Sequence, residues 1–238
     1  MAPVQTYARI AGALFLITVV AGGFGELFVP SRLIVPADAT KTASNILASD
    51  SLFRLGFAGY LVEAFCDITL TLLLYLLLRP VREDLALLAT LFRVVSTATF
   101  AVVELFYFAA ALPLRGADYL KTFSPDQLNA LALLSLRAYG LGGGIFMLFY
   151  GVASILLGYL MIRSGYLPRI LGALLALSGI GFVVYNFALV LAPRYAWSGL
   201  LAPAGLAALS LGLWLVVKGV DLAKWKERSQ RNALLAPS

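Results

Sequence analysis

The sequence predicts an all-α, polytopic integral membrane protein with six transmembrane helices. Hydrophobic residues make up 61% of the 238 residues, charged residues make up 13%, and the mean hydropathy is +0.92. Six apolar stretches reach the length of about 20 residues that crosses a hydrocarbon core of roughly 30 Å. Because lipid offers the backbone no hydrogen-bond partners, each stretch is expected to be a helix.

The first three predicted spans each end at residues that stop a membrane helix. The first ends before Pro30, the second at the polar turn 79–84, and the third at Pro113. The first span is longer than the apolar core of a signal peptide and no small-residue cleavage site follows it, so we expect it to be retained. The three spans are residues 8–29, 53–78 and 85–112.

The last three predicted spans are set by glycine, proline and basic residues. Glycines begin the fourth span, Pro168 occupies the first turn of the fifth, and the polar segment 193–197 separates the fifth from the sixth. These spans are residues 141–162, 170–191 and 200–217.

Two short amphipathic helices are expected between the spans, on the extracytoplasmic side. In the first, Asp38 is the predicted N-cap of a segment whose apolar residues recur at helical spacing up to Leu47. In the second, residues 124–127 (Ser-Pro-Asp-Gln) form a capping box. We expect that helix to run to about Tyr139, where the glycines of segment 140–144 interrupt it.

The spans leave room for one domain, residues 1–225, followed by a basic, disordered cytoplasmic tail, residues 226–238. Basic residues are denser on the side that holds the N-terminus, and the tail carries the densest cluster of them. By the positive-inside rule, both termini are expected in the cytoplasm. The predicted location is the cytoplasmic (inner) membrane of a bacterium.

Composition excludes several classes of site. The chain has no His and a single Cys, Cys66, so metal sites built on imidazole or several thiolates and Ser-His-Asp triads are excluded. No cofactor and no metal is predicted. The net charge of +6 is spread over the span ends rather than gathered on a soluble face. It therefore indicates membrane lipids as partners and not nucleic acid, while the oligomeric state stays open.

Several strings occur in a recognisable order along the chain. They include Ser31–Pro36, Asn45–Ser49, Leu52–Phe57, Cys66-Asp67, Phe92-Arg93, Leu157–Leu160 and Arg163–Gly172. Over nearly its whole length, the chain resembles the bacterial membrane-protein family called domain of unknown function 4386. The family's name implies no activity. Its pattern often has a His before the LLGYL-like segment, where this chain has Ala153-Ser154, which puts in doubt any mechanism that uses that imidazole.

Three ionisable residues are predicted to form an intramembrane polar site. Glu63 and Asp67 are four residues apart and share one face of the second predicted helix. The tight turn 79–84 makes the second and third helices antiparallel neighbours, and at about 1.5 Å per residue Arg93 reaches the height of Asp67. We expect Arg93 to face both carboxylates. The group is either a structural clamp between helices or a proton- or cation-linked path.

Four further charged residues are candidates for a second cluster near the outer surface, at the mouth of a cavity. Exposed charges at the membrane interface explain them as well. These residues are Glu26, Arg54, Glu104 and Arg137.

Three functions are compatible with this pattern, and no catalytic residue is predicted. The leading interpretation is a small transporter or permease-like protein that uses the intramembrane site for a small-molecule or ion ligand. The alternative is a non-catalytic accessory or lipid-binding membrane protein whose buried charges are structural. The third is an intramembrane lipid-modifying enzyme, for which carboxylates are the only evident catalytic groups.

Overall fold

The structure is a computed structural model that describes residues 4–235, with side chains described for residues 4–231, and helices account for almost all of that range. No strand occurs in the described part of the chain. The helices are α1 (Val4–Gly22), η1 (Gly23–Phe28), α2 (Val29–Leu33), α3 (Ala39–Ala48), α4 (Asp50–Leu78), α5 (Glu83–Ala109), η2 (Pro113–Arg115), η3 (Asp118–Leu120), α6 (Pro125–Ser164), α7 (Arg169–Leu191), η4 (Pro193–Tyr195), η5 (Ser198–Leu201), α8 (Ala202–Val217) and α9 (Leu222–Leu235).

Six helical segments are long and apolar enough to cross a membrane, which confirms the predicted all-α polytopic class. Many of their large apolar side chains face outward, among them Leu141, Val190 and Leu191, each more than three-quarters exposed. In water such a surface is an aggregation hazard, whereas in lipid it is the expected exterior. The segments are Val4–Leu33, Asp50–Leu78, Glu83–Arg115, Pro125–Ser164, Arg169–Leu191 and Ser198–Val217. The side of the membrane that holds the termini stays a prediction.

The chain divides into two compact units. The first unit comprises the chain up to Val19, Cys66–Thr97 and the chain from Ile145 onward, and the second comprises Val20–Phe65 and Ala98–Gly144. Helices α1, α4, α5 and α6 each contribute residues to both units. The single domain expected for residues 1–225 stays a prediction.

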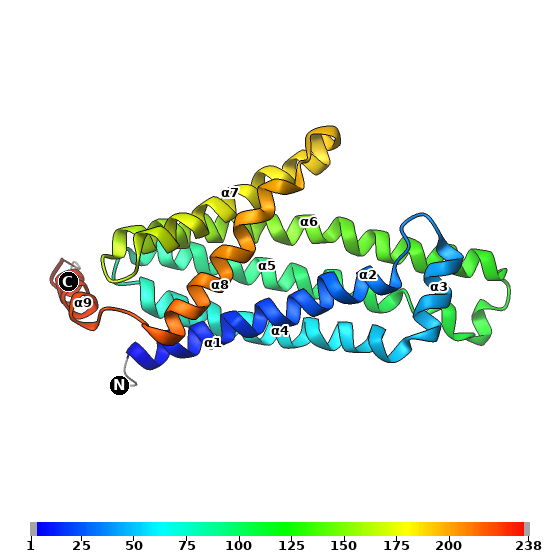
Figure 1. The fold of residues 1–238 in the computed structure, drawn as a ribbon, viewed down its shortest axis with the longest axis horizontal. Helices are drawn as coiled ribbons and strands as arrows, with labels where there is room; N and C mark the ends of the chain where they lie inside the picture. Colours follow the sequence, from blue (N-terminus) through cyan, green and yellow to red (C-terminus); the bar gives the residue numbers. More distant parts are fainter. Residues whose placement is uncertain (1–3, 236–238) are drawn as a thin grey trace. The chain divides into compact units, whose positions relative to one another are not determined.

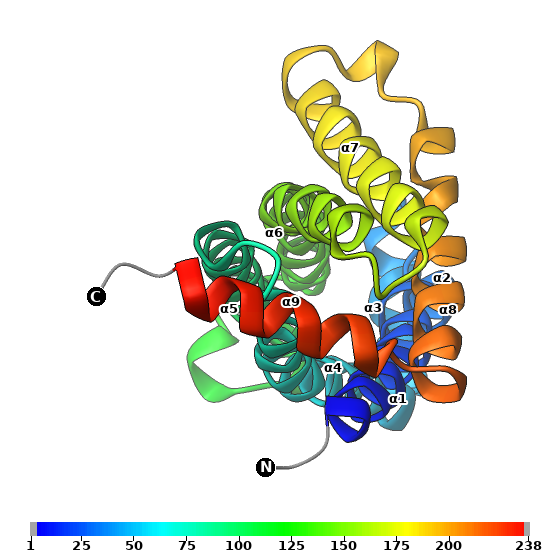
Figure 2. The same ribbon diagram turned by 90° about the vertical axis from the view of Figure 1, so that its left-hand side faces the viewer.

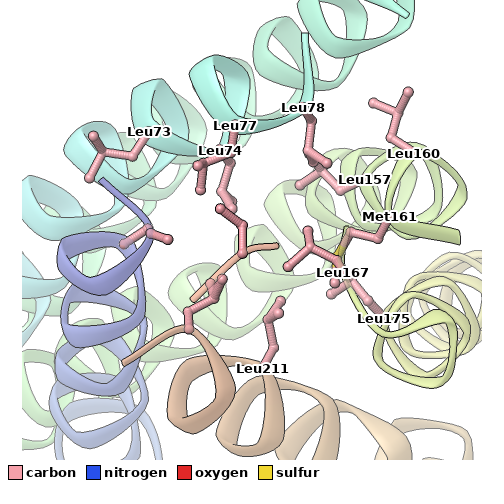
Figure 3. Close-up of a cluster of buried hydrophobic side chains, with 14 of the residues drawn as sticks. Leu73, Leu74, Leu77, Leu78, Leu157, Leu160, Met161, Leu167, Leu175 and Leu211 are labelled. Atoms are coloured by element: carbon pink, nitrogen blue, oxygen red, sulfur yellow. The ribbon is translucent and has the colours of Figure 1, made fainter. Parts of the chain in front are cut away.

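In the first unit, α7 and α8 meet at the loop that joins them and then diverge (Figure 1). Helix α7 runs along α6, and α8 crosses α1. A cluster of buried apolar side chains fills the space between these helices and the end of α4, as Figure 3 shows. Its labelled members are Leu73, Leu74, Leu77, Leu78, Leu157, Leu160, Met161, Leu167, Leu175 and Leu211.

Facing glycines set the distance between α6 and α7. Gly158 opposes Gly172, and one heptad away Gly151 opposes Gly179. A Cβ at Gly158 would lie 2.5 Å from the Gly172 carbonyl oxygen, and a Cβ at Gly179 would lie 2.5 Å from the Gly151 carbonyl oxygen. Small residues allow the close backbone approach by which membrane helices associate. Gly172 and Gly179 therefore serve helix packing.

Helix α9 lies across the ends of α4 and α5 in Figure 2, where the sequence predicted a disordered tail. The Trp225 indole and the Tyr166 hydroxyl both donate to the backbone oxygen of Leu77, at 3.1 and 2.7 Å. This oxygen lies in the last turn of α4, where carbonyls lack partners within the helix. Burial raises the pKa of the Tyr166 phenol, so it remains a donor. The prediction of disorder is wrong for residues 226–235, while residues 236–238 lie outside the described range.

In the second unit, the two predicted helix starts are confirmed. The Asp38 carboxylate accepts from the Lys41 N–H at 2.8 Å and caps α3. At the start of α6, the Ser124 N–H donates to the Gln127 side chain at 2.8 Å, and the Gln127 N–H donates to the Ser124 hydroxyl at 3.3 Å. This reciprocal pair is a capping box.

The predicted interruption of this helix at Gly140–Gly144 is wrong, because α6 continues without a break from Pro125 to Ser164. Unpaired backbone groups are costly in lipid, and this cost favours a continuous helix through the glycines. Gly142 instead allows close packing, since a Cβ there would lie 2.6 Å from Val103 Cγ2. The second amphipathic segment is thus the first part of a long membrane helix.

Two glycine substitutions in α6 are expected to change stability in opposite directions. Gly158→Ala puts a methyl group against the backbone of α7 and should lower the free energy of unfolding by about 1–3 kcal/mol. Gly140→Ala meets no atom within 4 Å and should raise it by up to about 1 kcal/mol. The melting temperatures of both variants in detergent test this. Equal melting temperatures for the two variants would contradict the packing role of Gly158.

Candidate functional site

Asp67 of α4 and Arg93 of α5 form an ion pair in the first unit. The Arg93 Nη2 group donates to Asp67 Oδ1, and the two side chains are 2% and 14% exposed. The helix spacing predicted that Arg93 faces Asp67, and the structure confirms this contact. A buried pair of opposite charges loses solvation, so its net effect depends on how completely its hydrogen-bonding groups are satisfied.

Two threonines add hydrogen bonds to this pair, while the Nη1 atom of Arg93 is buried without a partner among the described residues. Arg93 Nε donates to Thr71 Oγ1 at 2.9 Å, and Thr97 Oγ1 donates to Asp67 Oδ2 at 2.6 Å. Each threonine follows one charged partner by four residues on the same helix, so both side chains point to the same face. Both carboxylate oxygens of Asp67 are therefore occupied by donors.

Aromatic rings cover the guanidinium of Arg93. Its Cζ atom lies 5.1 Å from the ring centroid of Tyr150 in α6 and 5.9 Å from that of Phe15 in α1. Cations at this distance from a ring face are attracted by its quadrupole. Arg93 thus links α4 and α5 by polar bonds and contacts α1 and α6 by its faces. This arrangement is suited to holding helices together.

The third residue of the predicted site, Glu63, belongs to the second unit. Its carboxylate packs against Gly22, where a Cβ would lie 2.8 Å from Oε2. Of the two contacts predicted for Arg93, the structure confirms the one with Asp67.

Glu104 of α5 is a buried carboxylate in the second unit. Its side chain is 3% exposed, and neither of its oxygens has a hydrogen-bond partner in the described part of the chain. The carboxylates of Glu26 and Glu63 are close enough to interact with it electrostatically. Glu104 differs in this respect from Asp67, whose two oxygens both accept hydrogen bonds.

Three tyrosines of the second unit lie near Glu104, and they were not predicted from the sequence. The rings of Tyr60, Tyr107 and Tyr139 contact one another, with centroids 5.2 to 6.1 Å apart. The Tyr60 hydroxyl donates to the Gly25 carbonyl at 2.6 Å, so Tyr139, whose hydroxyl lies 2.9 Å away, donates to Tyr60. Tyr60 is three residues from Glu63, and Tyr107 is three residues from Glu104. This helical spacing places each tyrosine on the same face as a carboxylate and could have identified them from the sequence.

The Gly25 carbonyl belongs to η1, a single π-helical segment that also carries Glu26. Such segments arise where the regular helical hydrogen bonds are displaced, and they are frequent at functional sites. Gly25 also makes room for Tyr60, because a Cβ at this position would lie 2.9 Å from the Tyr60 ring. The segment therefore presents a backbone oxygen and a carboxylate from consecutive residues.

A cavity of about 430 Å³ adjoins Tyr139. Its lining is mainly apolar and includes Pro36, Arg137, Tyr139 and Gly140. Tyr139 forms part of the cavity wall and is hydrogen-bonded to Tyr60. The hydrogen bond between Tyr139 and Tyr60 thus connects the cavity wall with the tyrosine that contacts the π-helical segment.

Comparison with known proteins identifies the family of this chain. The family model described as "Domain of unknown function (DUF4386)" matches residues 10–219. The chain belongs to this family. An "Uncharacterized protein" of Archaeoglobus fulgidus is 26% identical over 170 residues, which cover 70% of this chain and 85% of that protein. No solved structure matches the chain.

In this DUF4386 protein, the two arginines of the second predicted cluster have partners outside it. Arg54 pairs with Asp50, with Nε 2.5 Å from Oδ2, and Arg137 donates to the Pro36 carbonyl. Glu26 and Glu104 lie near each other instead, together with Glu63. Among the described residues, no group of three or more His, Cys, Asp or Glu side chains is arranged to hold a metal ion.

A double-mutant cycle tests whether the Asp67–Arg93 pair is structural. Arg93→Ala and Asp67→Asn should each lower the free energy of unfolding, the former by about 3–5 kcal/mol because it leaves a buried carboxylate without its cation. The double variant should lose less than the sum of the two single losses. Denaturation of the purified protein in detergent provides the measurement.

The exposed pair Arg82–Asp84 is the matched control, with side chains 56% and 62% exposed. The same substitutions there should couple by no more than about 1 kcal/mol. Additive losses at Asp67 and Arg93 would contradict a structural pair.

Proposed function

We propose that this DUF4386 protein is a small permease-like membrane protein that binds a proton at Glu104 during transport. The observation that carries the proposal is the state of the Glu104 carboxylate. It is buried within the third membrane-spanning segment, and neither oxygen receives a hydrogen bond from the described residues.

An unpaired carboxylate in a membrane span is energetically costly. A charge at the centre of a membrane helix costs about 2.5–3.5 kcal/mol on insertion scales, and such residues are typical of ion and proton pathways. The nearby carboxylates of Glu26 and Glu63 increase the cost when more than one is ionised. A bound proton removes this cost, which is the physical reason for assigning one to the site.

The neighbouring groups support binding of a small ligand in the cavity that Tyr139 lines. Tyr139 joins the cavity wall to Tyr60, and the Gly25 carbonyl adds a backbone acceptor. Apolar cavities with a few convergent polar groups are typical ligand sites. The absence of a metal-binding group among the described carboxylates favours a proton over a metal ion.

A non-catalytic accessory membrane protein is the second candidate function. The observation that favours it is the Asp67–Arg93 pair, whose carboxylate is fully hydrogen-bonded. The charge of Asp67 is neutralised by Arg93 and both of its oxygens accept hydrogen bonds, so we assign this pair to helix association in either case.

Glu104→Gln tests the proposal, with the exposed Glu83→Gln in the same helix as the matched control. A proton that binds the folded state preferentially stabilises it, so the wild-type melting temperature should fall as pH rises through the binding range. Glu104→Gln should reduce this dependence without lowering the maximal melting temperature, and Glu83→Gln should retain it in full. A scan of melting temperature from pH 5 to 9 in detergent provides the measurement.

The same scan at several sodium concentrations separates a proton from another monovalent cation. Stabilisation by sodium that Glu104→Gln removes would assign a cation in place of the proton. A large loss of stability in Glu104→Gln with unchanged pH dependence would contradict both and would favour the accessory function.

A further inference from the structure

Three arginines line a cavity of about 390 Å³ in the first unit, where α6 ends and α7 begins. Arg163 and Arg169 flank the loop between the two helices, and Arg228 reaches the cavity from α9. The other lining residues are Ile162 and Gly165, so this cavity contains no acidic side chain. A neighbouring cavity of about 180 Å³ shares Arg228 and adds Lys224, Arg231 and Glu227.

The charges of these arginines are not neutralised within the described part of the protein. No ion pair there joins Arg163, Arg169 or Arg228 to an acidic residue. The Nε atom of Arg228 is buried and has no hydrogen-bond acceptor. Lys224, by contrast, has its own partner, with Nζ 3.3 Å from Asp221 Oδ2. Like charges placed together without a counter-charge favour an anionic ligand.

The cavity is held in shape by contacts that do not involve the arginines. Gly165 adopts a positive φ of 76°, which turns the chain sharply after α6 and brings Arg163 near Arg169. Tyr166 and Trp225 both donate to the Leu77 carbonyl, and the Asp221 N–H donates to the Tyr166 carbonyl at 3.2 Å. These bonds fix both the loop and α9, so Arg228 stays positioned over the cavity.

The position of the cavity along the membrane helices indicates the source of the anion. The fourth membrane-spanning segment ends at Ser164, and the fifth begins at Arg169. Since apolar spans end where the hydrocarbon core ends, we expect these ends at the level of the lipid headgroups, where the phosphate groups of the bilayer are found. Next to the cavity, Ile170 is 70% exposed and offers an apolar surface to an acyl chain.

We propose that Arg163, Arg169 and Arg228 bind the phosphate group of an anionic lipid headgroup. The planar guanidinium group matches phosphate oxygens with two parallel hydrogen bonds, which a lysine cannot provide. A soluble phosphate presents the same chemistry to this site, and the experiment separates the two sources.

The test compares two double variants that remove the same number of charges. Arg163→Gln/Arg169→Gln removes two cavity arginines, and Lys218→Gln/Lys226→Gln removes two exposed lysines that line neither cavity. Native mass spectrometry of the purified full-length protein measures binding of phosphatidylglycerol, with phosphatidylcholine as the neutral lipid. The arginine variant should bind phosphatidylglycerol about 25-fold more weakly, at about fivefold for each arginine, and the lysine variant should bind it like the wild type.

Arg228→Gln gives an independent readout, since it removes the α9 contribution and leaves the bonds to Leu77 in place. It should weaken phosphatidylglycerol binding about fivefold without changing phosphatidylcholine binding. Inorganic phosphate that raises the melting temperature of the wild type, but not of the arginine variant, and displaces phosphatidylglycerol would assign the site to a soluble phosphate. Equal binding of phosphatidylglycerol by the arginine and lysine variants would overturn the proposal.

Discussion

Helices in lipid gain little free energy by burying apolar side chains against one another, because the surrounding acyl chains are equally apolar. This constraint explains where the DUF4386 protein places its specific contacts. Facing glycines bring α6 against α7, and Gly12 brings α1 within contact of the backbone of α8, where a Cβ would lie 2.7 Å from the Gly212 oxygen. The Asp67–Arg93 pair adds a directional contact between α4 and α5.

The same constraint separates two kinds of buried charge in this protein. Asp67 receives hydrogen bonds from Arg93 and Thr97, and it therefore resembles a permanent structural element. Glu104 is as deeply buried as Arg93, yet neither of its oxygens is paired among the described residues. A carboxylate in this state is retained at a cost to stability, which is typical of residues that act on a ligand. The difference between them moves the candidate site from Asp67 to Glu104.

Some features of the fold and the site could be predicted from the sequence, and others could not. The i, i+4 spacing of charges and the short turn after α4 were sufficient to predict the contact of Arg93 with Asp67, because both depend on local helix geometry. The capping box at Ser124 was also readable. Tyr139 was missed because the glycines after it favoured a break, and the need to pair every backbone group in lipid overrode that local preference. The helical tail was missed because its order depends on Leu77, which is distant in sequence.

By itself, the sequence determined the membrane-spanning class, the six spans and the family, because these depend on apolar length, on local helix signals and on motifs that follow one another along the chain. Only the tertiary structure decided which buried charges are satisfied and which basic residues gather around a cavity. Glu104 and Asp67 are both acidic residues within predicted helices, and nothing local distinguishes them. Their environments differ because hydrogen-bond donors reach Asp67 from a neighbouring helix, and no such donor reaches Glu104 within the described residues. This difference depends on how the helices pack against one another, and the order of residues along each helix does not reveal it.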